Sequence, residues 1–250
     1  MYRSTIGALK YLTLSRPDIA FSVKKLSQFL QAPTQNQWKA CERILRYLVG
    51  TIGEGIWFTP ALSTTIESLS DSDWASSLDD RKSTTGYCVY FGGNLFSLSS
   101  RKHKSVARSS TVAEYRALAQ ACTEVVWLQS LFTKIGIKSA CPTVIWCENS
   151  RARQLASNSV FHSRTKHIEI DVHFTIDKVL DKEIEVRYIP SSEHTSHILT
   201  KSLSITSFHH LKNKLPISHS PLHSLRGRVE MKYEDVAQMQ NYTDVDEEDD

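Results

Sequence analysis

The chain has 250 residues, of which 40% are hydrophobic and 23% are charged. This composition supports a substantial hydrophobic core and excludes a disordered chain or a collagen-like repeat. Apolar runs fall short of the roughly 20 residues that cross a bilayer, so we predict no membrane partner. The five cysteines include no C-x-x-C pair, which argues against a disulfide framework and favours a reducing, intracellular location.

Charge is distributed unevenly along the chain. The formal net charge is +3, but residues 229–250 contain nine acidic residues and one lysine, a net charge of −8. The other 228 residues therefore carry +11. A basic body of this kind favours a polyanionic partner such as nucleic acid, the alternative being an ordinary soluble basic protein.

The first 60 residues predict a small helical unit. Apolar residues recur at helical spacing in three stretches, 3–14, 17–31 and 34–49. Pro17 can open the second helix, Pro33 ends it, and Thr34 is a candidate cap for the third. Three glycines at 50, 53 and 55 then end the unit, so we place a helical region over residues 1–60.

The pattern beyond residue 60 predicts an α/β domain. Three short strands with polar turns indicate an antiparallel meander, and a long helix over 110–135 follows it. Two continuous apolar strands then alternate with helices, which is typical of parallel strands buried on both faces. The expected segments are strands 65–70, 86–91, 95–99, 143–147 and 184–189, with helices 149–157 and 167–181 and one beginning near residue 196.

This order, β-β-β-α-β-α-β-α, predicts a five-stranded mixed sheet over residues 64–203. Residues 204–250 would add a C-terminal helix near 206–214 and a polar, acidic tail that we expect to be disordered.

Acidic residues fall where such a sheet would bring them together. The first strand would be central, so Asp71 at its end would lie near Glu148 at the end of the fourth strand. The long helix would present Glu114, and His197 would close the group. Converging carboxylates bind hard divalent cations, and two such ions can activate water against a phosphodiester. Taken singly, these residues have ordinary alternatives: a turn at Asp71, a first-turn helix acid at Glu114 and a cap at Glu148.

Two further groups of side chains suggest binding sites. Arg101, Lys102, Lys104 and Arg108 form a basic cluster before the long helix, which fits contact with a nucleic-acid backbone or a solvated hairpin end. Histidine pairs such as His194 and His197 could suggest zinc, but no Cys/His quartet accompanies them.

The sequence resembles the C-terminal part of copia-type long-terminal-repeat retrotransposon Pol polyproteins over about residues 2–215. Matching stretches include Ser70-Asp71-Ser72-Asp73-Trp74-Ala75 and residues 2–4, 11–13, 15–20, 43–48, 80–87, 109–117, 164–170 and 198–201. The resemblance implies a ribonuclease H-like fold that removes the RNA strand of an RNA–DNA hybrid. Residues 1–60 resemble the connection helices, and the reverse transcriptase portion, a further expected partner, would precede Met1.

The resemblance carries metal ligands onto this chain unevenly. Asp71 and Glu114 match family carboxylates, whereas Glu148 stands where the family has Asp and His197 where it has an acid. The family implies two Mg²⁺ or Mn²⁺ ions. An extra methylene and an imidazole both disfavour Mg²⁺, so we predict weakened metal binding and reduced or lost hydrolysis. Lys166, in the matching stretch 164–170, joins the expected nucleic-acid contacts.

Two other functions remain open from the sequence. The chain could be a decayed, non-catalytic retroelement fragment that binds hybrid or duplex nucleic acid through its basic residues. It could also be an interaction protein whose acidic tail, 230–250, recruits a basic partner. For a retroelement product, the expected intracellular location is a cytoplasmic particle or the nucleus.

Overall fold

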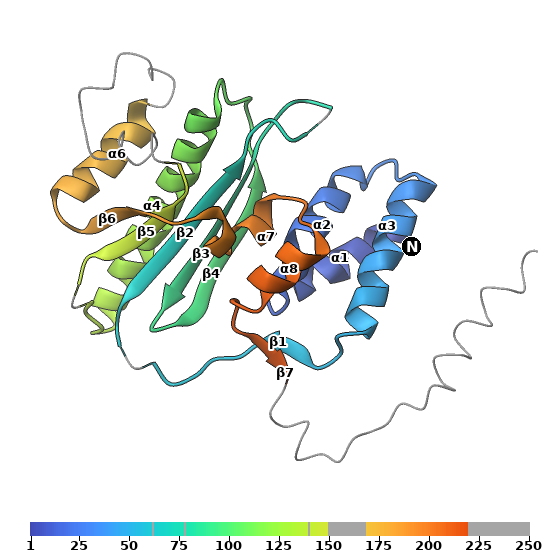
Figure 1. The fold of residues 1–250 in the computed structure, drawn as a ribbon, viewed down its shortest axis with the longest axis horizontal. Helices are drawn as coiled ribbons and strands as arrows, with labels where there is room; N and C mark the ends of the chain where they lie inside the picture. The colour runs from blue at the N-terminus through green and yellow to red at the C-terminus, as the bar shows by residue number, and fades with distance from the viewer. Residues whose placement is uncertain (62, 78, 140, 150–168, 220–250) are drawn as a thin grey trace, which may run out of the picture. The chain divides into compact units, whose positions relative to one another are not determined.

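The computed structural model describes residues 1–61, 63–77, 79–139, 141–149 and 169–219 (Figure 1). The expected helix 149–157 falls almost entirely outside these residues, as do Lys166 and the acidic tail. Residues 1–218 form one unit. No helix among the described residues is long and apolar enough to cross a membrane.

The chain begins with three α-helices, as predicted. They are α1 (Tyr2–Leu12), α2 (Ala20–Leu26) and α3 (Gln35–Val49). The second is shorter than expected, because 3₁₀ turns at Pro17–Ile19 and Ser27–Phe29 replace its ends. Thr34 precedes α3 as predicted, and its backbone N–H donates to Gln37 Oε1 at 2.9 Å. The three helices share an apolar core that includes Ile6, Leu9, Val23, Cys41 and Ile44.

A five-stranded mixed sheet follows, in the order β4-β3-β2-β5-β6. The first three strands pair with one another in an antiparallel meander: β2 (Ile66–Asp73), β3 (Thr84–Phe91) and β4 (Asn94–Lys102). The fourth strand, β5 (Thr143–Cys147), runs parallel to β2, and β6 (Ile184–Tyr188) runs parallel to β5. The predicted α/β fold and the central position of the first strand are therefore confirmed.

Helices cover both faces of the sheet (Figure 1). Strand β3 shows why, because its apolar side chains alternate between two cores. Val89 packs with α4 (Ser110–Lys134) and α6 (Glu169–Leu180), whereas Cys88 packs with α7 (His197–Thr200) and α8 (Ile205–Lys212). The second core also includes Ala20, which joins α2 to this face.

Two features of the chain differ from the sequence expectation. Strand β2 continues to Asp73, three residues beyond the predicted strand, because its polar end pairs with Thr84–Tyr87 of β3. A small second sheet pairs β1 (Glu54–Ile56) with β7 (Ile217–His219). A 3₁₀ turn at Ser191–Glu193 leads from β6 toward α7.

Candidate active site

Three of the predicted site residues come together at one end of the sheet. Asp71 lies near the end of β2 with a fully buried side chain, and Glu148 directly follows β5. Because β2 and β5 are parallel neighbours, their carboxyl ends meet at the same edge. His197 begins α7 beside them, and ligand atoms of Asp71, Glu148 and His197 lie within 4.8 Å of one another. Among the described residues, this is the one cluster of His, Cys, Asp and Glu with metal-ligand spacing.

Cations of the protein already face the two carboxylates. His197 Nε2 lies 2.8 Å from Glu148 Oε2 and 3.4 Å from Asp71 Oδ1. Lys201 Nζ lies 3.1 Å from Asp71 Oδ1 and 3.9 Å from Glu148 Oε1. Asp71 Oδ1 and Glu148 Oε2 nevertheless accept no well-aligned hydrogen bond, so these contacts are mainly electrostatic.

Two hydrogen bonds fix the helix α7 over the site. The Ser100 hydroxyl donates to the Leu199 carbonyl at 2.6 Å, and the Thr200 hydroxyl donates to Asp71 Oδ2. The ring of His194 stacks on that of His197, with centroids 4.9 Å apart. The sequence prediction included neither Thr200 nor Lys201, although both stand in the matching stretch 198–201 and Lys201 lies one helical turn after His197.

The surroundings set the charge of each group. Burial would raise the pKa of Asp71, but the contact with His197 and the charge of Lys201 hold it well below its usual range. Contact with His197 also lowers the pKa of Glu148. Burial acts to lower the pKa of His197, yet its two carboxylate neighbours raise it overall. The site therefore combines ionised carboxylates with an imidazole that favours its cationic form.

Glu114 lies close to this cluster but outside the 4.8 Å set. It comes from the first turns of α4, its residue is 7% exposed, and it feels the charges of Asp71, Lys201 and Glu148. Burial and the nearby Asp71 raise its pKa to about 9. Glu114 is consequently protonated at neutral pH in this arrangement.

The second aspartate of the Asp71-Ser72-Asp73 stretch is engaged in the turn that follows β2. Asp73 accepts hydrogen bonds from the Ser76 hydroxyl and the Thr84 backbone N–H. Burial raises its pKa to about 6. Asp73 thus shapes the loop beside the site.

The predicted basic cluster is divided by the structure. Lys102 Nζ contacts Asp80 Oδ1 at 2.9 Å and donates to Gln28 Oε1 and Ser77 Oγ at 2.9 and 3.0 Å. Arg101, Lys104 and Arg108 are exposed. Three of the four residues therefore present free surface, and Lys102 holds two loops together.

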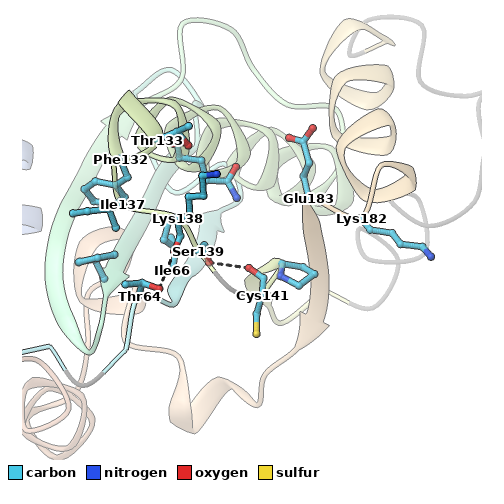
Figure 2. A pocket seen from close by; sticks show the side chains of 13 residues that line it. Thr64, Ile66, Phe132, Thr133, Ile137, Lys138, Ser139, Cys141, Lys182 and Glu183 are labelled. Atoms are coloured by element: carbon cyan, nitrogen blue, oxygen red, sulfur yellow. Dashed lines mark hydrogen bonds between the residues drawn. The ribbon is translucent and has the colours of Figure 1, made fainter. Parts of the chain in front are cut away.

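A separate cavity of about 470 Å³ lies at the other end of β2 and β5 (Figure 2). Its lining includes Ile66 at the start of β2 and Phe132 near the end of α4. Some of its polar groups bond within the rim, as where the Ser139 hydroxyl donates to the Cys141 carbonyl at 2.9 Å. The predicted site residues lie outside it.

The strand order, the parallel β2–β5 pair and the acidic group at their carboxyl ends define a protein of the ribonuclease H-like class. No protein-family model matches the chain. Over 220 residues it is 43% identical to the retrovirus-related Pol polyprotein from transposon RE1 of Arabidopsis thaliana, which covers 88% of this chain and 15% of that protein. Over 208 residues it is 36% identical to the corresponding polyprotein from transposon TNT 1-94 of Nicotiana tabacum, covering 83% and 16%.

The chain is similar to a segment of the copia-type retrotransposon Pol polyproteins, and it spans about 15% of the length of the Arabidopsis polyprotein and 16% of the Nicotiana one. Similar solved structures include LC11-RNase H1 in complex with RNA/DNA hybrid. That match has a TM-score of 0.41 and 16% identity, and covers 54% of this chain and 94% of that one.

Proposed function

We propose that this chain acts on the RNA strand of RNA–DNA hybrids by metal-assisted phosphodiester hydrolysis, and that Glu148 and His197 impair this activity. The observation that carries the proposal is the convergence of Asp71, Glu148 and His197 within 4.8 Å, with Glu114 buried close by. The reverse transcriptase portion of the polyprotein would be its partner. The other functions considered from the sequence gain no support, and the cellular compartment stays a prediction.

The donor set fits a divalent cation. Asp71 Oδ1 and Glu148 Oε2 are buried oxygens without a hydrogen-bond partner among the described residues, and hard cations prefer such oxygens. His197 supplies a nitrogen, which Mn²⁺ accepts more readily than Mg²⁺ does. Bound there, a divalent ion would polarise a phosphoryl oxygen and lower the pKa of coordinated water. These three residues suit one ion, and Glu114 would have to contribute to a second.

The remaining side chains would position the ligands and the substrate. The Thr200 hydroxyl orients the Asp71 carboxylate by donating to Oδ2. Lys104 and Arg108 are exposed in the segment that precedes α4, where they can contact substrate phosphates. The protonated Glu114 can ligate only after losing its proton, so cation binding would release protons.

Impairment follows from the two departures from the family pattern. Glu148 carries its carboxylate on one more methylene than Asp, which displaces a ligand whose geometry Mg²⁺ restricts closely. His197 replaces a negative charge with an imidazole whose pKa is raised. A cationic imidazole 2.8 Å from Glu148 neutralises the charge that would attract a metal ion.

Hydrolysis of a labelled RNA–DNA hybrid tests the proposal with Mg²⁺ and, separately, Mn²⁺. We expect slow turnover by the natural chain, faster turnover with Mn²⁺, and none after Asp71→Asn. The double variant Glu148→Asp/His197→Asp should be faster than the natural chain. Absence of turnover in both the natural chain and the double variant would refute the proposed activity, and turnover that survives Asp71→Asn would refute the site.

A further inference from the structure

A second cavity, lined by positively charged side chains, lies beside the sheet. A cavity of about 470 Å³ opens between helices α1 and α2 and the edge strand β4, which lie close together in Figure 1. Three cations line it, Lys10, Lys24 and Arg101, together with the hydroxyl side chains of Ser97, Ser99 and Ser100. None of the described residues that line it is acidic. We call this cavity the basic groove.

The three cations of the basic groove lack acidic partners. No carboxylate among the described residues lies within ion-pair distance of Lys10, Lys24 or Arg101. Burial, together with the charges of Lys10 and Arg101, lowers the pKa of the half-buried Lys24. The next residue along β4, Lys102, contrasts with them because it contacts Asp80 at 2.9 Å. Like charges gathered without a counter-ion destabilise the groove until an anion neutralises them.

Aromatic side chains accompany the charges. Phe58 and Phe96 both line the basic groove, and they are 67% and 47% exposed. Cations that neutralise phosphates and exposed aromatic side chains on which bases stack are the features that bind a nucleic-acid strand. An acidic protein segment would use the charges but would have less use for the aromatic faces.

The basic groove lies close enough to the candidate active site for one nucleic-acid strand to contact both. Arg101 pairs with Thr85 of β3, and the adjacent Gly86 pairs with Asp71 of β2. Two strand spacings therefore separate Arg101 from Asp71, which is about 10 Å. Phosphates along one strand of a duplex advance by about 3.4 Å, so this span corresponds to about three nucleotides.

We propose that the basic groove binds the phosphate backbone of a nucleic-acid strand whose neighbouring segment occupies the active site. The inference rests on the proposed function, which supplies the substrate class, and adds Lys10 and Lys24 of the helical region as substrate contacts. The groove would hold and orient the hybrid and take no part in the chemical step.

Salt-dependent binding tests the inference without any cleavage. The affinity for an RNA–DNA hybrid is measured with EDTA present, between about 50 and 200 mM salt. The test variant is Lys10→Gln/Lys24→Gln/Arg101→Gln. Its control, Lys39→Gln/Lys134→Gln/Lys138→Gln, removes the same charge from exposed lysines outside the groove.

We expect the test variant to lose about 2 to 3 from the slope of log K against log salt, since each phosphate contact contributes about 0.9. The control should keep the natural slope. Equal slopes in the two triple variants would overturn the inference. A polyglutamate peptide that binds the natural chain as tightly as the hybrid, and loses affinity in the test variant, would overturn the assignment to nucleic acid.

Folding and activity are separated from this readout. Removing crowded like charges should leave the melting temperature unchanged or raise it, and Lys24→Gln alone should lower the slope by about 1. Asp71→Asn should abolish hydrolysis and preserve the slope. If no variant hydrolyses hybrid but the slopes differ as expected, the proposed activity fails and the groove inference stands.

Discussion

The close approach of β3 and α7 at Gly86 is a sensitive point of the structure. Gly86 pairs with Asp71 in the sheet and lies beneath α7. A Cβ atom added there would lie 2.6 Å from Thr200 Cγ2 and 2.8 Å from Leu199 Cβ, whereas ordinary contacts begin near 3.4 Å. The Thr200 side chain cannot rotate away without breaking its hydrogen bond to Asp71, and Leu199 Cβ moves only with the backbone. Gly86→Ala should therefore displace α7.

The expected cost combines three effects. Overpacking of this kind destabilises by about 1–3 kcal/mol. Loss of the hydrogen bond between Thr200 and Asp71 adds about 1 kcal/mol. The lower backbone entropy of the unfolded alanine variant offsets about 0.4–1 kcal/mol of this loss of stability. We expect Gly86→Ala to lower the free energy of unfolding by about 1–3 kcal/mol, equivalent to roughly 2–4 °C in Tm per kcal/mol.

Urea unfolding of two alanine variants measures this effect. The control is Gly7→Ala in α1, where an added Cβ would meet nothing within 4 Å. Helix propensity predicts that this control gains about 0.5–1 kcal/mol. If Gly86→Ala were as stable as Gly7→Ala, the packing of α7 on β3 described above would be wrong.

Two further predictions concern buried polar groups. Asp18→Ala removes a carboxylate that accepts hydrogen bonds of 3.0 and 2.7 Å from the buried Arg16. Because the buried Arg16 then keeps only Glu54, 3.7 Å away, as an acidic neighbour among the described residues, the substitution should lower the free energy of unfolding in urea by up to about 3–5 kcal/mol. A loss below about 1 kcal/mol would contradict this reasoning. Burial, together with the charge of Arg116, lowers the pKa of His103 to about 4. Between about pH 6.5 and pH 4 the unfolded chain therefore binds a proton at His103 that the folded chain does not bind. Stability should accordingly decrease as the pH is lowered through this range. His103→Gln should make that fall shallower by up to about 1.4 kcal/mol per pH unit, and an unchanged pH slope would refute it.

The order of helices and strands could be predicted because apolar periodicity changes clearly along the chain. The end of β2 was missed because Asp71, Ser72 and Asp73 have the composition of a polar turn, although all three are buried in the sheet. The pairing of β1 with β7 was missed for another reason. Each strand has three residues, and about 160 residues separate them, so no local pattern indicates the pair.

The acidic part of the site followed from topology, since parallel neighbours bring their carboxyl ends together. The positions of the charged residues around it could not be predicted from the topology. Lys201 approaches Asp71 only because α7 lies across β3, a tertiary contact that spacing cannot show. The basic residues were grouped by sequence proximity, but Asp80 engages Lys102 while Arg101 joins Lys10 of α1 at the basic groove.

The central claim is that Asp71, Glu148 and His197 form a divalent-metal site weakened by its last two members. Calorimetric titration with Mn²⁺ of the natural chain, Asp71→Asn and Glu148→Asp/His197→Asp tests it most directly. A unit charge about 4 Å away contributes about 4 kcal/mol at an effective dielectric constant of 20, so a gain of at least tenfold in affinity is a conservative expectation for the double variant. We expect weak binding by the natural chain, none by Asp71→Asn, and binding at least tenfold tighter by the double variant. Equal affinity in the natural chain and the double variant would contradict the claim.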